Sequence, residues 1–295
     1  MKHTLSFVAC LLFSGTVWAQ ADSVVAPGAL LQKVSDQFTF TEGPAVDREG
    51  NIFFTDQPND RIWKYATDGT LSLYREKTGR SNGMFFDRKG NLISCADEND
   101  ELWSIDKKGK VTVLLSQFEG KKFNGPNDLW IAPNGGIYFT DPFYPRDYWS
   151  RKTPDLEAER VYFLPKGAKE ARIVEAEIKK PNGIVGTPDG KYLYVSDIGS
   201  WKTYRYTLAA DGSLKDKYLF CEQGSDGMTL DEHGNLYLSG KGVSVYNTSG
   251  KKIRQIPVPS GWVGNVCFGG KDRKTLLITA STTVYTLKMN VKGVE

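Results

Sequence analysis

The sequence predicts an all-β protein, a six-bladed β-propeller with four strands in each blade. Three observations predict it: one phrase returns six times along the chain, its copies are spaced as propeller blades are, and the composition favours strands. The 295 residues include 30 Gly, 15 Phe, 14 Tyr and 7 Trp, which suit short strands joined by tight turns better than long helices.

The repeated phrase is a polar turn with a glycine, followed by an apolar strand. Its copies span 46–56, 86–97, 131–141, 186–197, 230–240 and a degraded 268–280. The glycines of the first five, Gly50, Gly90, Gly135, Gly190 and Gly234, are separated by 40, 45, 55 and 44 residues. Glycine reverses the chain in such hairpins because it adopts positive φ readily. A third and a fourth strand then fill each repeat.

The sixth copy holds only three strands before the chain ends. We therefore expect residues 30–34 to supply its fourth strand, so that an N-terminal strand completes the last blade. Closure of the ring in this way removes the exposed sheet edges that an open sheet of this size would have.

Residues 1–19 are predicted to be a signal peptide, which leaves 20–295 as a single propeller domain. The segment has Lys2, an apolar stretch, and small residues at Val17 and Ala19, which fit a cleavage site after Ala19. A bacterial protein that is periplasmic or secreted follows from this interpretation. An uncleaved anchor and a lipoprotein at Cys10 are the alternatives.

Charge and residue counts exclude several classes of function. Lys and Arg number 38 against 35 Asp and Glu, so there is no strong field for nucleic acid, and no membrane insertion is expected after the signal. His233 is the only histidine after residue 19, in a turn predicted to face away from the channel, which argues against Ser-His-Asp and Cys-His mechanisms. The cysteines lack zinc spacing and are predicted to be buried thiols. The oligomeric state stays open.

One polar residue stands just before, or at the start of, each strand predicted to be innermost. These residues are Glu42, Asn82, Asn127, Asn182, Asp226 and Asn265. Innermost strands of a propeller begin around the channel at one face, so we expect the six side chains to converge. Two carboxylates and four amides form an oxygen site for one divalent cation, Ca²⁺ first, with Mg²⁺, Mn²⁺ or Zn²⁺ as alternatives. The other interpretation is that they are turn residues that bond their own backbone.

Acidic residues also end several second strands near the same face. Asp56, Asp97, Asp141 and Asp197 could bind substrate hydroxyls or cap loops by accepting backbone N–H bonds. The longest insertion, 142–159, could be a lid over that face or a solvated loop.

Five short motifs resemble the senescence-marker-protein/regucalcin/gluconolactonase family of six-bladed propellers. They are TEGPAVD at 41–47, PND at 126–128, YFTD at 138–141, PNGI at 181–184 and SDGM at 225–228. The resemblance covers essentially all of the chain after the signal. It implies hydrolysis of a sugar lactone with a single divalent cation in the channel.

The resemblance also implies roles for individual residues. Glu42, Asn182 and Asp226 would hold the metal, Asn127 would hold metal or substrate, and Asp226 would be the general base. Some members carry an arginine where this chain has Gly125, so the substrate contacts must differ here. We expect them among Asn82, Asn124, Asn127, Asp141, Tyr144 and Trp149.

The leading hypothesis is therefore metal-dependent hydrolysis of a lactone similar to glucono-1,5-lactone, with a five-carbon aldonolactone close behind. The cation would polarise the carbonyl, and Asp226 would take a proton from the attacking water. Direct coordination would lower the pKa of Asp226 and make it a weaker base. A metal-dependent esterase or phosphotriesterase is the first alternative, although such propellers often use a channel histidine. A non-catalytic binding propeller without metal is the second.

Overall fold

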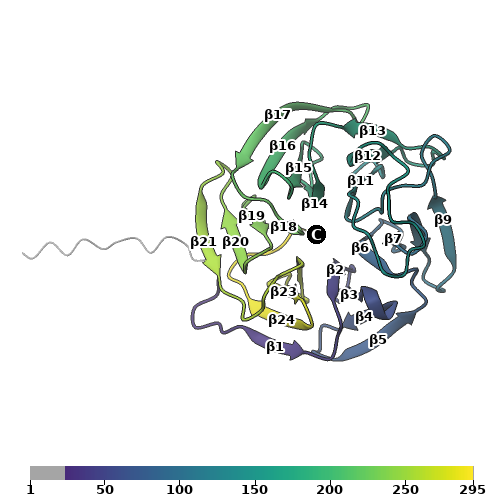
Figure 1. Ribbon diagram of the computed structural model, residues 1–295. Helices are drawn as coiled ribbons and strands as arrows, with labels where there is room; N and C mark the ends of the chain where they lie inside the picture. Colours follow the sequence, from purple (N-terminus) through teal and green to yellow (C-terminus); the bar gives the residue numbers. More distant parts are fainter. Residues whose placement is uncertain (1–23, 295) are drawn as a thin grey trace, which may run out of the picture.

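The computed structural model describes residues 24–294, which form a ring of six four-stranded antiparallel sheets around a central axis (Figure 1). Each of the first five blades is built from four consecutive strands, the first of them nearest the axis. The strands of blades 1 to 3 are β2 (Thr41–Val46), β3 (Ile52–Asp56), β4 (Arg61–Tyr65), β5 (Leu71–Glu76), β6 (Ser81–Phe86), β7 (Leu92–Ala96), β8 (Glu101–Ile105), β9 (Val111–Leu115), β10 (Leu129–Ile131), β11 (Ile137–Asp141), β12 (Arg160–Leu164) and β13 (Arg172–Glu175).

Blades 4 and 5 repeat this order, and a short 3-10 helix, η1 (Gln57–Asn59), follows β3. Blade 6 combines three C-terminal strands with one strand from the other end of the described chain. The strands of these three blades are β14 (Pro181–Gly186), β15 (Tyr192–Asp197), β16 (Lys202–Leu208), β17 (Leu214–Cys221), β18 (Met228–Leu230), β19 (Leu236–Leu238), β20 (Val243–Tyr246), β21 (Lys252–Ile256), β22 (Asn265–Gly269), β23 (Thr275–Ala280), β24 (Thr283–Lys288) and β1 (Gln32–Ser35).

The predicted closure of the ring is confirmed. β1 pairs antiparallel with β24, with Gln32 opposite Thr286 and Lys33 opposite Tyr285. The closing strand therefore lies within two residues of the expected segment, and the outermost strand of blade 6 comes from the N-terminal side.

Turns of the Asp-x-x-Gly type join the first two strands of several blades, as the repeats predict. In blade 1 the backbone N–H of Asn51 donates to Oδ1 of Asp47 over 2.8 Å, and Gly50 has φ +93°. The same bond recurs between Asn91 and Asp87. A residue with a Cβ would be strained at the glycine position, which explains its return in each copy.

The core lies between blades and is densest near the axis. Every residue of β2 and β14 is buried, whereas most of β5 and β17 is exposed. Cys95, Cys221 and Cys267 are buried thiols, as predicted.

The last residues of the described chain lie at the centre of the ring in the view of Figure 1. After β24, the N–H of Gly293 donates to the carbonyl of Arg273, and that of Val294 donates to the carbonyl of Leu230. The signal-peptide prediction for 1–19 falls outside the described residues. Among residues 24–294 there is no long apolar helix of the kind that crosses a membrane.

Candidate metal centre and active site

The six polar residues predicted to converge lie where the innermost strands begin. Glu42, Asn82 and Asn182 are the second residues of β2, β6 and β14, and Asn265 is the first residue of β22. The other two, Asn127 and Asp226, lie two residues before the first residue of β10 and β18. Five of the six are buried, and Asp226 is half-buried. The carboxylate of Asp226 is therefore the most accessible of the set.

Glycines that follow these polar residues let adjacent blades approach closely at the axis. A Cβ on Gly43 would lie 1.9 Å from the carbonyl oxygen of Asn82 in the next blade. One on Gly183 would lie 2.7 Å from the carbonyl oxygen of Asp226. Because these positions carry no side chain, the polar residue of one blade lies against that of the next.

Glu42, Asn182 and Asp226 come from blades 1, 4 and 5, and Asp226 interacts with both of the others. Burial raises the pKa of Glu42 well above its usual value, and the nearby charge of Asp226 raises it further. Burial also raises the pKa of Asp226 to about 6, while hydrogen bonds from Trp262 and Asn182 lower it. Two neighbouring carboxyls whose pKa values are both raised form a site that a cation would stabilise.

The donor atoms fit a hard divalent cation. Oδ1 of Asn182 is buried and has no hydrogen-bond partner, while its Nδ2 donates to the hydroxyl of Tyr144 over 3.0 Å. A buried carbonyl oxygen without a partner is costly, and a metal ion would satisfy it. Among residues 24–294 no three His, Cys, Asp or Glu side chains are grouped closely enough to hold a metal. A cation here would therefore need amide oxygens as well as the carboxylates.

The remaining amides divide into two kinds. The side chains of Asn82 and Asn127 form no hydrogen bond with the rest of the described chain, so their oxygens are available to a cation or a substrate. By contrast, Asn265 donates Nδ2 to Oε2 of Glu42 over 3.2 Å, and its Oδ1 accepts the N–H of Val266 over 2.8 Å. Asn265 therefore positions Glu42, and the turn-residue interpretation applies to it.

Asp128 is a third acidic residue beside the site, and sequence reasoning missed it. Its charge raises the pKa of Glu42, and the position of a Cβ on Gly83 lies 2.6 Å from its Oδ1. The five other repeats carry glycine or valine after the polar residue, and only the third carries an acid at this position. This departure from the repeat is the sequence feature that could have identified Asp128.

Trp262 also escaped sequence reasoning. Its indole Nε1 donates to Oδ2 of Asp226 over 2.6 Å, which leaves Oδ1 as the oxygen without a bond to the indole. The residue lies in the loop before β22, and no repeat places a tryptophan at an equivalent position.

Three of the four rim aspartates cap loops. Asp141 accepts the N–H groups of Asn124 and Gly125 over 2.9 and 2.8 Å, and Asp56 and Asp197 accept equivalent bonds in their own blades. Burial raises the pKa of Asp141 to about 7. With no exposed surface, Asp141 cannot touch a substrate in this structure, which favours the capping alternative over the predicted substrate contact.

Two more predicted substrate residues also have structural partners. Asn124 is fully buried, and its Nδ2 donates to the carbonyls of Asp141 and Ala158. Trp149 is 6% exposed and donates Nε1 to the carbonyl of Asp97 over 2.8 Å. Both residues therefore stabilise loops through these hydrogen bonds, because their polar groups point into the protein. Tyr144, by contrast, is half-buried and contacts Asn182.

The insertion 142–159 is a lid packed across neighbouring blades and not a solvated loop. Asp97 of blade 2 accepts bonds from Arg146, over 3.0 Å, and from the hydroxyl of Tyr148. Arg151 donates to Asp100 over 2.6 Å. In this way blade 2 anchors a segment of blade 3, and Tyr144 reaches the channel residue Asn182 of blade 4.

A family model described as the SMP-30/gluconolactonase/LRE-like region matches residues 28–282. The chain belongs to this family. It is 27% identical to a gluconolactonase of Zymomonas mobilis, over 92% of this chain and 85% of that protein. A solved gluconolactonase structure from Xanthomonas campestris is 29% identical with a TM-score of 0.83, covering 90% of this chain and 91% of the other.

A third solved relative is a calcium-binding regucalcin from Agrobacterium tumefaciens. It is 21% identical with a TM-score of 0.74 and covers 90% of this chain and 95% of the other, which supports the fold alone. The resemblance indicated by the five short motifs is therefore confirmed at the level of the family, whose members include a gluconolactonase.

Proposed function

We propose that this protein hydrolyses a sugar lactone similar to glucono-1,5-lactone, using one divalent cation held by Glu42, Asn182 and Asp226. The observation that carries the proposal is the convergence of these three side chains from three blades, with Oδ1 of Asn182 buried and unpartnered. Asn127 and Asn82 supply further amide oxygens at the same ring. Ca²⁺ is the first choice because it accepts many oxygen ligands of mixed charge.

The chain's own residues perform the proton transfers. Asp226 takes a proton from water as the water oxygen bonds to the lactone carbonyl carbon, and it returns that proton to the ring oxygen when the ring C–O bond breaks. Trp262 holds one carboxylate oxygen in place, so the other faces the water. When bound, the cation supplies polarisation of the carbonyl and lowers the barrier to water attack. Tyr144 and the amides orient the lactone.

The test is a pH-stat assay of the purified protein on a small lactone panel, with chelator and metal add-back. We expect acid release from a six-carbon or a five-carbon aldonolactone. Chelator should abolish this acid release, and added Ca²⁺ should restore it. Aryl esters and a phosphotriester serve as comparison substrates. Chelator-insensitive lactonase activity, or faster turnover of the phosphotriester than of every lactone, would overturn the proposal.

We further propose that the protein is exported after cleavage at Ala19 and acts in the periplasm or outside the cell. The features of residues 1–19 support this. Mass spectrometry of the protein recovered from a bacterial periplasmic fraction should give a chain that begins at Gln20. Recovery of the uncut chain in the cytoplasm alone would contradict it.

A further inference from the structure

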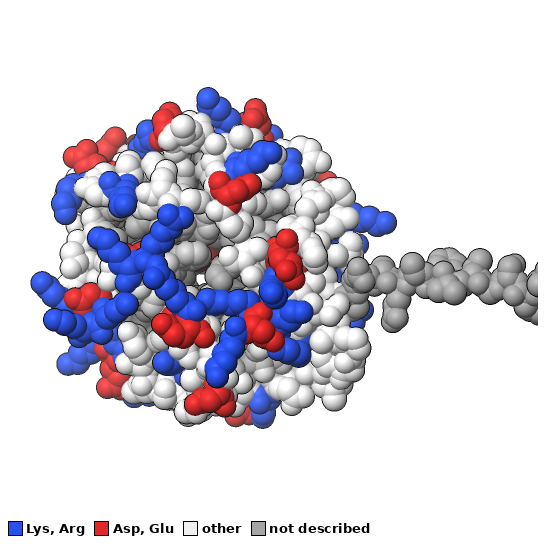
Figure 2. All heavy atoms as spheres, turned by 180° about the vertical axis from the view of Figure 1, so that it is seen from behind, with Lys and Arg blue, Asp and Glu red and all other residues white. Residues whose placement is uncertain are grey.

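The face opposite the channel residues carries a cavity of about 550 Å³ between blades 2 and 3. Its apolar wall is made by Phe85, Ile93, Leu114, Trp130 and Ile137. We call it the lower cavity. Its volume lies in the range of about 300–1,000 Å³ that small-molecule sites occupy. In Figure 2, which shows this side of the molecule, Lys and Arg side chains gather around a hollow near the centre.

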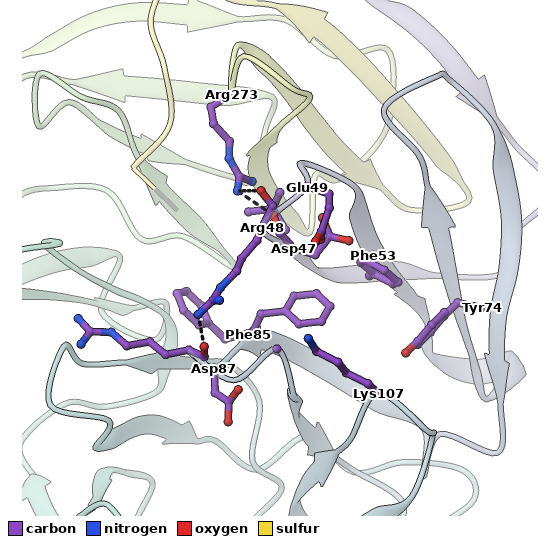
Figure 3. A pocket seen from close by; sticks show the side chains of 13 residues that line it. Asp47, Arg48, Glu49, Phe53, Tyr74, Phe85, Asp87, Lys107 and Arg273 are labelled. Atoms are coloured by element: carbon purple, nitrogen blue, oxygen red, sulfur yellow. Dashed lines mark hydrogen bonds between the residues drawn. The ribbon is translucent and has the colours of Figure 1, made fainter.

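The neighbouring gap, between blades 1 and 2, holds a smaller cavity of about 420 Å³, and arginine side chains span it (Figure 3). There Arg48 reaches across the gap and donates to the carbonyl of Arg88. Arg273 of blade 6 donates in the same way to the carbonyl of Asp47, over 2.7 Å. Each of these guanidinium groups ties the turn of one blade to the turn of the next.

Arg88 occupies in blade 2 the repeat position that Arg48 occupies in blade 1, directly after the turn aspartate. The corresponding bond would cross to Pro133 of blade 3. No such bond forms: within residues 24–294 the guanidinium of Arg88 makes no hydrogen bond or ion pair. The lower cavity lies in this gap, and no arginine bond spans it.

The charge around the lower cavity is unbalanced. Among residues 24–294 the only acid lining it is Asp87, and its oxygens already accept N–H bonds from Lys89 and Asn91 in its own turn. Within this range four cations against one acid leave a net charge of +3, and none of the four has an acidic partner in the described chain. The four cations are Arg88, Lys89, Lys166 and Lys169.

We propose that the lower cavity binds a medium-chain fatty carboxylate. The alkyl chain would lie against Phe85 and Trp130, where burial of apolar surface supplies the affinity. The carboxylate would pair with Arg88, whose planar fork of donors matches it. A ligand that is only apolar would leave the cations without partners, and one that is only charged would leave the apolar wall in water. This site is separate from lactone hydrolysis and does not depend on it.

The test is isothermal titration calorimetry of the purified protein with decanoate, kept below its micellar concentration. Decanol serves as the ligand without charge and butyrate as the ligand without a long chain. We expect decanoate to bind at one site per chain, and each comparison ligand to bind at least about tenfold more weakly, because each loses one of the two contributions. Equal binding of decanol and decanoate, or no heat with decanoate, would overturn the proposal.

Variants locate the site. Arg88→Gln should weaken decanoate binding about fivefold or more, because a charge-assisted bond is lost. Ala168→Phe should fill the cavity and remove binding. The matched control is Arg254→Gln, which removes an exposed arginine from β21 in blade 5 and should leave binding unchanged. If Arg88→Gln and Arg254→Gln bind decanoate alike in protein with the wild-type melting temperature, the carboxylate does not sit at Arg88 and the proposal fails. Arg88→Gln carries this test even if Ala168→Phe does not fold.

Discussion

The indole Nε1 of Trp262 lies 2.6 Å from Oδ2 of Asp226. This bond joins the loop before β22 in blade 6 to the residue pair before β18 in blade 5. It opposes the effect of burial, which raises the pKa of the Asp226 carboxyl to about 6. A carboxylate that one donor orients and burial makes more basic suits a general base near neutral pH.

Removing that donor should move the acid limb of the activity profile. Trp262→Phe keeps an aromatic ring but loses the N–H, so the pKa of Asp226 rises and less carboxylate is ionised at any given acidic pH. We expect kcat/KM on the acid limb to fall about tenfold for each unit of that rise, at constant Ca²⁺. Trp201→Phe, at an exposed tryptophan of blade 4, is the control. An unmoved acid limb would show that Trp262 does not act on the base.

Asp226→Asn should abolish turnover while the fold survives. A loss of about 10²–10⁴-fold in kcat is expected for removal of a general base, together with weaker cation binding. The metal-free variant should melt no lower than the wild type, because the amide removes a buried negative charge beside Glu42. The control is Asp155→Asn, an exposed position on the lid. Ordinary activity in a folded, metal-loaded variant would remove Asp226 from the mechanism.

Stability in chelator should fall as pH rises, whereas the stabilisation that Ca²⁺ adds should grow with pH. Burial raises the pKa of Asp226 to about 6, of Asp100 to about 6 and of Asp141 to about 7. A carboxyl whose pKa is raised on folding binds more protons when folded, so the free energy of unfolding falls as pH rises from about 4 through 7. Cations compete with protons at Asp226 and Glu42, so Ca²⁺ should stabilise most above pH 6.

The measurement is the melting temperature in EDTA and in Ca²⁺ between pH 4.5 and pH 8. In EDTA we expect a steady decrease above about pH 5, and in Ca²⁺ a gain that grows with pH. A Ca²⁺-induced gain that is the same at pH 5 and pH 8 would mean that these carboxyls do not hold the ion.

Gly43→Ala should separate the first two blades at the axis. Its Cβ would lie 1.9 Å from the carbonyl oxygen of Asn82, and this backbone atom can move only if blade 2 moves. Its φ of +46° adds strain. We expect a loss of about 3 kcal/mol or more in the free energy of unfolding by denaturant. Gly261→Ala, with no atom within 4 Å of the new Cβ, should change it by about 0.5 kcal/mol or less.

The blades could be predicted because the information for them is local. Most copies carry their own turn aspartate and glycine, as at Asp47 and Gly50, and this turn bond joins residues four apart in the chain. The ring of polar residues could be predicted from the same repeats. Equivalent positions of the repeats lie on the innermost strand and at the same face in each blade.

Contacts of residues that depart from the repeated pattern could not be predicted. Asp141 and Asp97 hold equivalent positions, yet Asp141 caps its own loop while Asp97 binds a lid residue 49 positions away. Asp60 explains the difference, because it accepts the N–H groups of Thr78 and Arg80 and leaves Asp97 free for the lid. The sequence did not reveal the hydrogen bonds of Asn124 and Trp149, and both residues were therefore expected to contact the substrate.

The lid gives the last prediction. Nε of Arg146 lies 3.0 Å from Oδ2 of Asp97, and this ion pair fixes the segment that carries Tyr144 to Asn182. Arg146→Ala would leave a buried carboxylate without its cation, and burial already raises the pKa of Asp97. The segment should then open more often, so hydrogen exchange across 142–159 should be faster and KM should rise more than kcat falls, because Tyr144 acts in binding.

Glu157→Ala is the matched control, since Glu157 is an exposed residue of the same lid and has no polar contact in the described chain. It should leave both exchange and KM unchanged. If Arg146→Ala accelerates exchange but leaves KM as it was, the lid is a stabilising cover that takes no part in binding. Unchanged exchange in Arg146→Ala would show instead that the contacts of Trp149 with Asp97 and of Arg151 with Asp100 hold the lid without it.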